Sequence, residues 1–317
     1  MAKSTPNNRA LWNKVLSEAR QKFDVYPCVP MESQAITPNG LAHASELKEG
    51  NLILSYDMHT DYLVWSPVLA IHTYKNAPTV EMYKPTGFSI VCTPDHQWVV
   101  ERTMFSGGKT GPNGCKGERY LDRRLLPTRD INTHMDIVWT GRPLQGNASI
   151  NLDWHKHQSW TTKVLNMSPT EREAFFAAAI VYDGADQGAT KKREGHRFIF
   201  SQKNLDHYFA AVLAGFCNGY YVSMAQKTDS IRSAIFTRGK RTHNTQNIKV
   251  RDAATQDVWC PSTEHETWVM VQNGVICVTG NSAYANAWAA KEYKKRGGTW
   301  SGADNRVKKD GKKGRSG

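Results

Sequence analysis

The chain has 317 residues, of which 39% are hydrophobic and 22% charged, a balance typical of a soluble globular protein with one to three domains. Its longest apolar runs, residues 174–182 and 208–217, are far shorter than the roughly 20 residues that a membrane span needs. The first residues lack the apolar core of a signal peptide, and the six scattered cysteines form no Cys-x-x-Cys pair. We therefore expect a reduced, cytoplasmic protein with no membrane association, rather than a secreted disulfide scaffold or a zinc ribbon.

The net charge of +12 is concentrated at the two ends of the chain. Residues 1–27 carry five basic and two acidic side chains, and residues 282–317 carry ten basic and three acidic ones. The two ends together hold +10, which leaves only +2 for the 254 residues between them. This division indicates two different proteins in one chain, one of which interrupts the other.

The hydrophobic pattern changes its period along the chain. Apolar residues recur at helical spacing over residues 9–23, which predicts an amphipathic helix with Lys and Arg on its other face. From residue 35 onward, short apolar runs alternate with turn residues, which indicates an all-β unit. The Gly- and Lys-rich residues 105–118 predict a mobile loop. The predicted strands are 52–56, 62–65, 68–74, 89–92 and 98–100.

A segment of different character interrupts the β pattern between about residues 150 and 240. Ser168 and Glu171 form a capping box with proline at the first helical position, which predicts a helix that runs to Tyr182. Asn204 caps a second predicted helix over residues 205–217. This α-β-α-β-β order indicates an insertion into the β unit. Its predicted strands are 197–201, 220–224 and 231–237, and β-type sequence then resumes over residues 248–278.

Four short motifs occur in one order along the chain. They are Cys28 with the stretch that ends at Gly40, Thr93-Pro94-Asp95-His96 with Trp98 shortly after, Cys260 with His265, and a last strand that ends in Thr279-Gly280-Asn281-Ser282. In this order the motifs resemble an intein, a self-splicing element with the Hint (hedgehog/intein) fold, over residues 28–140 and 245–281. The resemblance implies a mainly β, horseshoe-shaped Hint fold with an inserted α+β subdomain and short helical basic flanks.

These residue types suit acyl transfer within a backbone, which needs a thiol or hydroxyl aimed at a peptide carbonyl and a proton donor for the departing nitrogen. His96 is placed to protonate that nitrogen, and Thr93 to hydrogen-bond the distorted peptide at residues 27–28. The side-chain amide of Asn281 can attack its own carbonyl, which closes a succinimide and cuts the chain before Ser282. The Ser282 hydroxyl holds the N-terminal segment as an ester until an O-to-N shift restores a peptide bond.

One departure from the commonest inteins concerns the first nucleophile. An Asp usually stands where this chain has Cys260, and Trp98, Cys260 and Thr279 fit the Trp-Cys-Thr signature of class 3, phage-associated inteins. That class implies that Cys260 attacks the N-terminal junction directly and forms a branched thioester. Cys28 still occupies the first intein position, so either thiol can initiate. We favour Cys260 on this signature, and Pro27 favours it further, because a prolyl carbonyl is awkward to shift onto its immediate neighbour.

A second departure concerns asparagine cyclisation. A His often precedes the terminal Asn in inteins, whereas this chain has Gly280, so cyclisation would depend on His265. Each site residue also has a purely structural alternative. Cys260 can be a small buried apolar residue, the histidines can be satisfied core groups, and Trp98 can serve packing alone.

The inserted segment contains residues 177–184, which resemble a degenerate LAGLIDADG motif of homing endonucleases. In such enzymes the closing acid binds a divalent metal for phosphodiester cleavage, so Asp183 would hold Mg²⁺ if the insertion is an active nuclease. A single motif must dimerise to cut DNA, and no second copy is visible. A relic that only fills space is the alternative that we favour.

The predicted domains are an N-extein at 1–27, the first Hint part at 28–145, the LAGLIDADG-like insertion at 146–245, the second Hint part at 246–281 and a C-extein at 282–317. Splicing would leave a basic two-helix product, in which Tyr284 and Trp288 pack on Leu11, Val15 and Phe23. This product resembles small basic phage proteins, which implies the cytoplasm of an infected bacterial host. Splicing needs no cofactor or partner, and DNA contact is expected only from the insertion or the basic product. The alternative function is a DNA-binding or homing-endonuclease protein whose Hint-like part is inactive.

Overall fold

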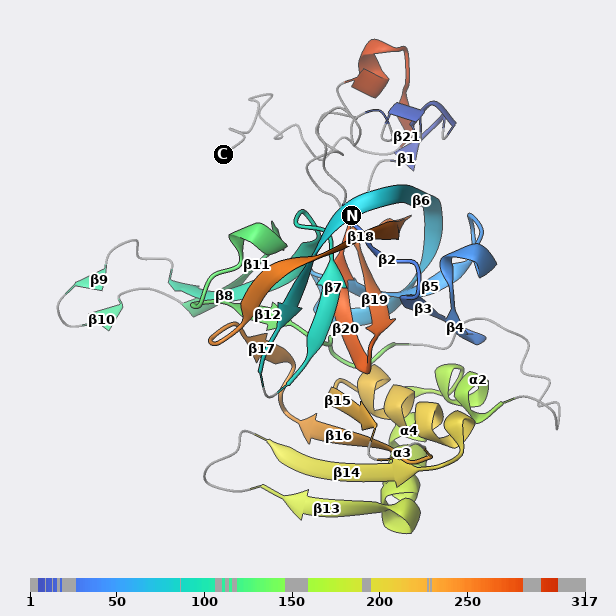
Figure 1. Cartoon of the computed structure of the whole chain (residues 1–317), viewed down its shortest axis with the longest axis vertical. Coiled ribbons are helices and arrows are strands. Elements are labelled where there is room, and N and C mark those ends of the chain that lie inside the picture. The colour runs from blue at the N-terminus through green and yellow to red at the C-terminus, as the bar shows by residue number, and fades with distance from the viewer. Residues whose placement is uncertain are drawn as a thin grey trace. The chain divides into compact units, whose positions relative to one another are not determined.

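The chain forms two compact units, of which one contains both ends, residues 1–26 and 282–317, and the other residues 27–281. The boundaries between them fall between Tyr26 and Pro27 and between Asn281 and Ser282. The architecture is that of a computed structural model (Figure 1). It describes residues 5–8, 10–12, 14, 15, 18, 27–85, 87–105, 110, 111, 114, 115, 119–145, 159–189, 195–226, 228, 230–281 and 292–301.

The terminal unit is held together by pairs of residues from opposite ends of the chain. Strand β1 (Thr5–Pro6) pairs antiparallel with β21 (Trp300–Ser301). The Tyr293 hydroxyl oxygen accepts a hydrogen bond from the Asn8 N–H at 2.8 Å, and the Tyr293 ring meets Trp12 edge-on. Residues 10–12, 14, 15 and 18 are helical, as are residues 292–295, within the two predicted flanking helices. The other predicted contacts, of Phe23, Tyr284 and Trp288, lie outside the described residues.

Residues 27–145 and 239–281 form two antiparallel sheets, so the prediction of a mainly β architecture is confirmed. The larger sheet has the order β17-β12-β8-β20-β19-β3-β4, with β11 also on β8, and the smaller has the order β2-β18-β6-β5, with β7 on β6. The strands of the larger sheet are β3 (Gln34–Thr37), β4 (Gly40–Ala42), β8 (Gln97–Phe105), β11 (Arg119–Pro127), β12 (Asp136–Val138), β17 (Thr242–Asn244), β19 (Thr267–Gln272) and β20 (Val275–Gly280). Those of the smaller sheet are β2 (Val29–Pro30), β5 (Leu52–Asp57), β6 (Tyr62–Tyr83), β7 (Ser89–Cys92) and β18 (Lys249–Thr263).

The structure corrects the sequence prediction at two places in this β unit. The strands predicted at 62–65 and 68–74 are one 22-residue strand, β6. Pro67 lies where β6 changes partner from β5 to β18, so the missing N–H of proline does not end the strand. The second place is the predicted loop at 105–118, of which the structure describes 105, 110, 111, 114 and 115. Strands β8 and β11 form a long antiparallel ribbon, and within the predicted loop β9 (Thr110–Gly111) pairs with β10 (Gly114–Cys115) (Figure 1).

The inserted segment is a four-stranded sheet with helices, in the strand order β13-β14-β16-β15. Its predicted caps are confirmed, since Ser168 with Glu171 forms a capping box and Asn204 accepts a hydrogen bond from the His207 N–H. The prediction missed helix α2 and strand β13. The elements are α2 (Trp160–Leu165), α3 (Pro169–Asp183), β13 (Gly184–Gly188), β14 (His196–Gln202), α4 (Leu205–Cys217), β15 (Tyr221–Gln226) and β16 (Arg232–Arg238).

Both omissions have a tertiary cause. The first N–H groups of α2, on Trp160 and Thr161, donate to the carboxylate of Asp206 in α4, at 2.7 and 3.0 Å. A helix of six residues depends on such long-range capping, which the local sequence does not reveal. Strand β13 contains no β-branched or aromatic residue and is specified by its pairing with β14.

The insertion and the β unit share one hydrophobic core. A single cluster of buried side chains contains Leu54 and Val278 from the β unit together with Phe176 and Phe216 from the insertion. Strand β17, which lies inside the predicted range of the insertion, pairs with β12 of the larger sheet. Among the described helices, none has both the length and the apolar character to cross a membrane.

Candidate functional site

The N-terminal junction lies against Cys260. Strands β2 and β18 are antiparallel, with Val29 opposite Trp259, and this register brings Cys28 beside Cys260. Both cysteines are fully buried, and their Sγ atoms are 3.1 Å apart although 232 positions separate them in the chain. The two candidate nucleophiles therefore lie side by side, next to the peptide that links Pro27 to Cys28.

Thr93 holds the peptide that links Pro27 to Cys28. The Cys28 N–H, which is the amide hydrogen of that peptide, donates to Thr93 Oγ1 at 3.0 Å. The Thr93 N–H and hydroxyl in turn donate to the Cys28 carbonyl oxygen, at 3.0 and 3.3 Å. Thr93 follows directly after β7, so the end of this strand fixes the geometry of the junction.

His96 lies in the tight turn between β7 and β8 and is fully buried. Its Nε2 atom is hydrogen-bonded to Thr279 Oγ1, which brings the second and fourth sequence motifs together. Burial lowers the pKa of His96 to about 4, although the backbone of Pro27 acts in the opposite direction. The ring is therefore neutral near pH 7, and it lies close to the carbonyl side of the junction.

Trp98 forms a wall of the site. Its ring meets His96 edge-on, with centroids 5.0 Å apart, and its Nε1 donates to Thr128 Oγ1 at 2.9 Å. Thr128 also donates its N–H to the His96 carbonyl oxygen at 2.8 Å. Sequence reasoning missed Thr128, which comes from the far end of the β8–β11 ribbon, and no local motif marks it.

The side chain of Asn281, at the other end of residues 27–281, contacts the backbone next to Cys260. Asn281 is almost fully buried, and its Nδ2 donates to the carbonyl oxygen of Pro261, the residue after Cys260, at 3.0 Å. The Asn281 N–H donates to the carbonyl oxygen of Glu266 at 2.9 Å. Ser282 lies outside the described residues.

His265 belongs to the turn that holds this junction, because it directly precedes Glu266. Its Nδ1 lies 4.0 Å from Asp57 Oδ1. Gly280, between Thr279 and Asn281, has no room for a side chain, since a Cβ atom would collide with Leu125 and lie 3.0 Å from the Cβ of Gln97. A side chain before the terminal asparagine would therefore require the Leu125 side chain to move.

Asp183, the predicted metal ligand, belongs to no group of metal-ligating side chains among the described residues. It ends α3, is exposed, and accepts one hydrogen bond from Gln202 at 3.0 Å. No group of three or more metal-ligating side chains occurs among the described residues. The described side chains around Asp183 therefore do not fit a metal centre built by one chain.

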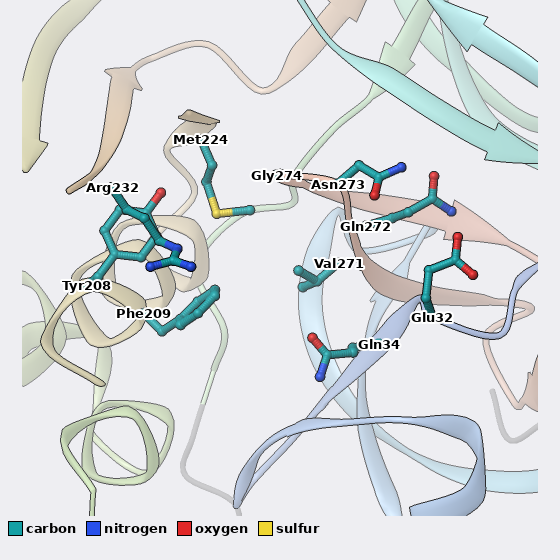
Figure 2. Close-up of a pocket in the computed structure, with 10 residues that line it drawn as sticks. All are labelled: Glu32, Gln34, Tyr208, Phe209, Met224, Arg232, Val271, Gln272, Asn273 and Gly274. Atoms are coloured by element: carbon teal, nitrogen blue, oxygen red, sulfur yellow. The ribbon is translucent and has the colours of Figure 1, made fainter. Parts of the chain in front are cut away.

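Where the insertion meets the β unit there is a cavity of about 390 Å³ that contains none of the predicted site residues. Figure 2 shows Tyr208, Phe209, Met224 and Arg232 of the insertion on one side, and the turn of β19 and β20 with Glu32 and Gln34 on the other. The insertion therefore lies against the hairpin whose second strand leads to Asn281.

Comparison with protein-family models and with curated proteins finds no match. Among solved structures, a GSH-linked, splice-inactive variant of the AceL NrdHF class 3 split intein is similar at 8% identity, over 81% of this chain and 99% of that one, with a TM-score of 0.38. A DnaB intein from Synechocystis sp. PCC 6803 is similar at 7% identity, over 80% and 98%, with a TM-score of 0.36. A gp41-1 intein with three substitutions is similar at 10% identity, over 80% and 98%, with a TM-score of 0.31.

Proposed function

We propose that this chain is a self-splicing precursor, in which residues 28–281 are a Hint-fold intein that excises itself and joins Pro27 to Ser282. The observation that supports this most directly is the position of Cys28, Cys260 and Asn281 in one buried site. The two ends of residues 27–281 meet there, while the flanking segments form a unit of their own. This is the arrangement that removal of a middle segment requires.

The proposed reaction uses only groups of the chain. The Cys260 thiol gives its proton to the neutral ring of His96, and its sulfur attacks the Pro27 carbonyl carbon. The bond from that carbon to the Cys28 nitrogen then breaks, His96 delivers a proton to the nitrogen, and a thioester on Cys260 remains. The Ser282 oxygen next attacks the thioester, returns the sulfur as a thiol and holds residues 1–27 as an ester.

Asparagine cyclisation then releases the intein. Asn281 Nδ2 attacks its own main-chain carbonyl carbon, so a succinimide forms and the peptide bond to Ser282 breaks. The freed Ser282 amine attacks the ester, and the resulting O-to-N shift leaves an ordinary peptide bond between Pro27 and Ser282. Before reaction, the Pro261 carbonyl holds this amide through a hydrogen bond from Nδ2.

Expression in a heterologous host tests the proposal. Splicing converts the 35.6 kDa precursor into a species of ~28 kDa and one of ~7 kDa, sizes scaled from the residue counts. Mass spectrometry of the smaller species should find the fused sequence Tyr26-Pro27-Ser282-Ala283. Persistence of the intact chain under reducing conditions at neutral pH would contradict the proposal.

Alanine variants of the two cysteines distinguish the initiating thiol. We expect Cys260→Ala to abolish the branched intermediate and the ligated product, since the attacking sulfur is lost. Cys28→Ala should still give ligated product, because its nitrogen and not its sulfur takes part in the direct route. The ratio of precursor to product on a denaturing gel measures both, and the reverse pattern would assign initiation to Cys28.

For the insertion we propose a structural role rather than DNA cleavage. Its motif resembles LAGLIDADG, but Asp183 has no second acidic ligand among the described residues. Its buried side chains are continuous with the core of the β unit. The insertion thus contributes to the stability of the splicing site.

A further inference from the structure

Gln272 is a polar residue on a buried, otherwise apolar face of β19. The other residues on that face of the strand, Trp268 and Met270, belong to a buried hydrophobic cluster. Gln272 is only 3% exposed, although it stands at the tip of the β19–β20 hairpin, where a glutamine normally faces water (Figure 2). A buried carboxamide costs stability unless its polar groups have partners, so its contacts show what it holds in place.

The Gln272 amide completes the edge of β7. Among the described strands β7 pairs only with β6, so its other edge carries backbone groups that no described strand satisfies. The Val91 N–H donates to Gln272 Oε1 at 2.7 Å, and Gln272 Nε2 donates to the Val91 carbonyl oxygen at 2.9 Å. One side chain therefore supplies both the acceptor and the donor that a neighbouring strand would supply.

The next residue along that edge is Thr93, which holds the N-terminal junction. Alternate residues of an extended strand direct their backbone groups to the same edge, so the N–H of Thr93 follows that of Val91. The Thr93 N–H donates to the Cys28 carbonyl oxygen at 3.0 Å. Gln272 and Cys28 thus occupy successive positions along one edge, and the bonds to Val91 fix the strand end that carries Thr93.

A further contact joins Gln272 to the other side of the junction. Its Nε2 also donates to Ser33 Oγ at 2.8 Å, and Ser33 is fully buried. The Ser33 N–H donates to the Pro30 carbonyl oxygen at 3.0 Å, which closes the turn directly after β2. The Ser33 carbonyl oxygen accepts a hydrogen bond from Trp259 Nε1 at 3.2 Å, and Trp259 precedes Cys260. The Gln272 amide therefore ties the end of β7 to the turn that follows the junction.

The hairpin tip fixes the position of Gln272. Asn273 and Gly274 have φ angles of 47° and 76°, the left-handed conformations of a two-residue Asn-Gly turn, which sets the register of β19 with β20. Gln272 pairs with Val275 at this tip, whereas Asn281 directly follows the opposite end of β20. The first step at the N-terminal junction should therefore depend on Gln272 far more than asparagine cyclisation does.

We propose that Gln272 is a positioning residue for the first splicing step, which holds Thr93 against the Cys28 peptide while the thiol attacks. This inference rests on the proposed splicing function and deepens it. No bond of Gln272 forms or breaks in the reaction, because its oxygen and both of its N–H groups are used to hold Val91 and Ser33. Its effect is geometric, since a displacement of about 1 Å at reacting groups can cost on the order of 100-fold in rate.

The two steps can be measured separately in the full chain. With Asn281→Ala, excess dithiothreitol releases the N-terminal segment from the thioester, and the rate of release follows the first step. With Cys28→Ala and Cys260→Ala together, cleavage before Ser282 follows asparagine cyclisation alone. We expect Gln272→Met to slow the first step by about 10- to 100-fold and cyclisation by less than about 3-fold. Equal slowing of both steps, or an unchanged first step, would overturn the proposal.

Asn166→Leu is the matched control for the loss of a buried amide. Asn166 is almost fully buried, and its Nδ2 donates to the carbonyl oxygens of Pro38 and Thr162, both at 2.9 Å. These acceptors belong to the turn between β3 and β4 and to α2, not to β7. The control should lower stability and leave the ratio of the two rates unchanged. Selective slowing of the first step by Asn166→Leu would contradict a specific role for Gln272.

Ser33→Ala is the smaller change, which keeps the proposal testable if Gln272→Met does not fold. It removes one hydrogen bond of the amide and should slow the first step by about 3- to 10-fold. Because the two side chains act as one unit, Ser33→Ala should add little when Gln272→Met is already present. Fully additive effects of the two substitutions would contradict the proposal.

Hydrogen exchange measured by NMR gives a readout that needs no splicing. The full chain with Cys28, Cys260 and Asn281 replaced by alanine cannot react. In this background Gln272→Met should speed exchange at the amides of both Val91 and residue 28. Faster exchange at Val91 alone would limit Gln272 to a local structural role and overturn the proposal. If the unsubstituted chain does not splice, the proposed function fails, whereas the exchange result still decides whether Gln272 holds the junction.

Discussion

The pairing of two strands brings Cys28 and Cys260 together, although they are distant in the sequence. Neither cysteine belongs to a local metal or redox motif, and each alone is a small buried side chain. The antiparallel pairing of β2 with β18 places the two sulfur atoms 3.1 Å apart at a peptide bond. At this distance the two thiols share one environment, so a change at one sulfur affects the other.

Oxidation should therefore stop splicing reversibly. A disulfide oxidant such as oxidised glutathione would take two electrons and two protons from the thiols, link Cys28 to Cys260 and remove the attacking sulfur. We expect oxidised precursor to accumulate and dithiothreitol to restore splicing. Peptide mapping by mass spectrometry would identify the Cys28–Cys260 link.

Cys28→Ala is the control for this prediction, because it leaves Cys260 without a sulfur partner. The variant should splice with or without the oxidant. Equal inhibition of the variant would indicate that the oxidant acts at another site, such as mixed disulfide formation on Cys260 alone.

At the scale of single elements, neighbouring strands leave little space for a side chain at Gly280, the last residue of β20. A Cβ atom on Gly280 would collide with Leu125 from β11 and come within 3.0 Å of the Gln97 Cβ in β8. We expect Gly280→Ala to cost about 1–3 kcal/mol of stability through overpacking and to slow C-terminal cleavage. Thermal denaturation of a non-splicing chain and the rate of succinimide formation measure the two effects.

The second substitution Leu125→Ala should partly restore cleavage in Gly280→Ala, because it removes the colliding methyl group. Leu125→Ala alone serves as the control for the loss of the leucine itself. Full activity of Gly280→Ala without compensation would show that β20 can shift away from β11.

The two segments that connect the β unit with the insertion both contact the carboxylate of Asp61. Arg142 precedes the insertion and Arg241 follows it, and both contact Asp61, at 3.2 and 2.5 Å. Arg123 of β11 lies 3.2 Å from the same carboxylate, and the Tyr56 hydroxyl donates to it at 2.8 Å. Asp61 thus ties the insertion to the hairpin of β5 and β6.

This cluster predicts a loss of stability in acid. Burial alone would raise the pKa of Asp61, but the hydrogen bonds from Arg241 and Tyr56 and the charges of Arg241 and Arg123 outweigh it, so the pKa is lowered on folding. A lowered pKa gives stability that is present above the unfolded pKa, about 3.9, and is lost as the pH falls through the folded pKa. We expect the urea concentration at which half of a non-splicing chain is unfolded to decrease once the pH is below about 4.

Asp61→Asn tests the assignment. Loss of the buried negative charge should cost about 3 kcal/mol at pH 7, because Arg142 and Arg241 lose their carboxylate partner and Arg123 keeps only Glu101. The fall in acid should be smaller than in the parent. An unchanged pH dependence in Asp61→Asn would assign the acid sensitivity to other carboxylates.

At the scale of the whole molecule, the chain divides by folding unit rather than by sequence order. The segments before and after residues 27–281 pair with each other through β1 and β21, although nearly the entire chain lies between them. Within residues 27–281, by contrast, the insertion and the β unit share one core. The terminal unit is separate, whereas the insertion is not.

Deletion of the insertion should therefore prevent folding of the splicing site. Replacement of residues 146–238 by a short Gly-Ser linker would expose side chains such as Leu54 and Val278, and each large apolar side chain contributes about 1.5–3 kcal/mol by burial. Since domains are stable by only about 5–15 kcal/mol, we expect insoluble protein without splicing. The soluble fraction and the yield of ligated product measure this.

The matched control shortens the chain elsewhere. Removal of residues 106–118, with Phe105 joined to Arg119 by an Asn-Gly turn, keeps the pairing of β8 with β11 and should leave splicing intact. A soluble, splicing-competent deletion of residues 146–238 would contradict a structural role for the insertion.

The sequence by itself determined the features that depend on near neighbours. The caps at Ser168 and Asn204, helix α4 with its predicted bounds, and most strands follow from local periodicity and short-range hydrogen bonds. The candidate residues of the site were also visible as spaced motifs, because their residue types suit acyl transfer.

Only the tertiary structure decided what these residues touch. The 3.1 Å contact of Cys28 with Cys260, the bond of Thr128 to Trp98 and the collision that reserves position 280 for glycine all arise from strands that are distant in the chain. Likewise, α2 depends on Asp206, and the Thr279 hydroxyl meets the Gln97 carbonyl of a different strand. Such contacts depend on sheet register and side-chain packing, which no window of neighbouring residues specifies.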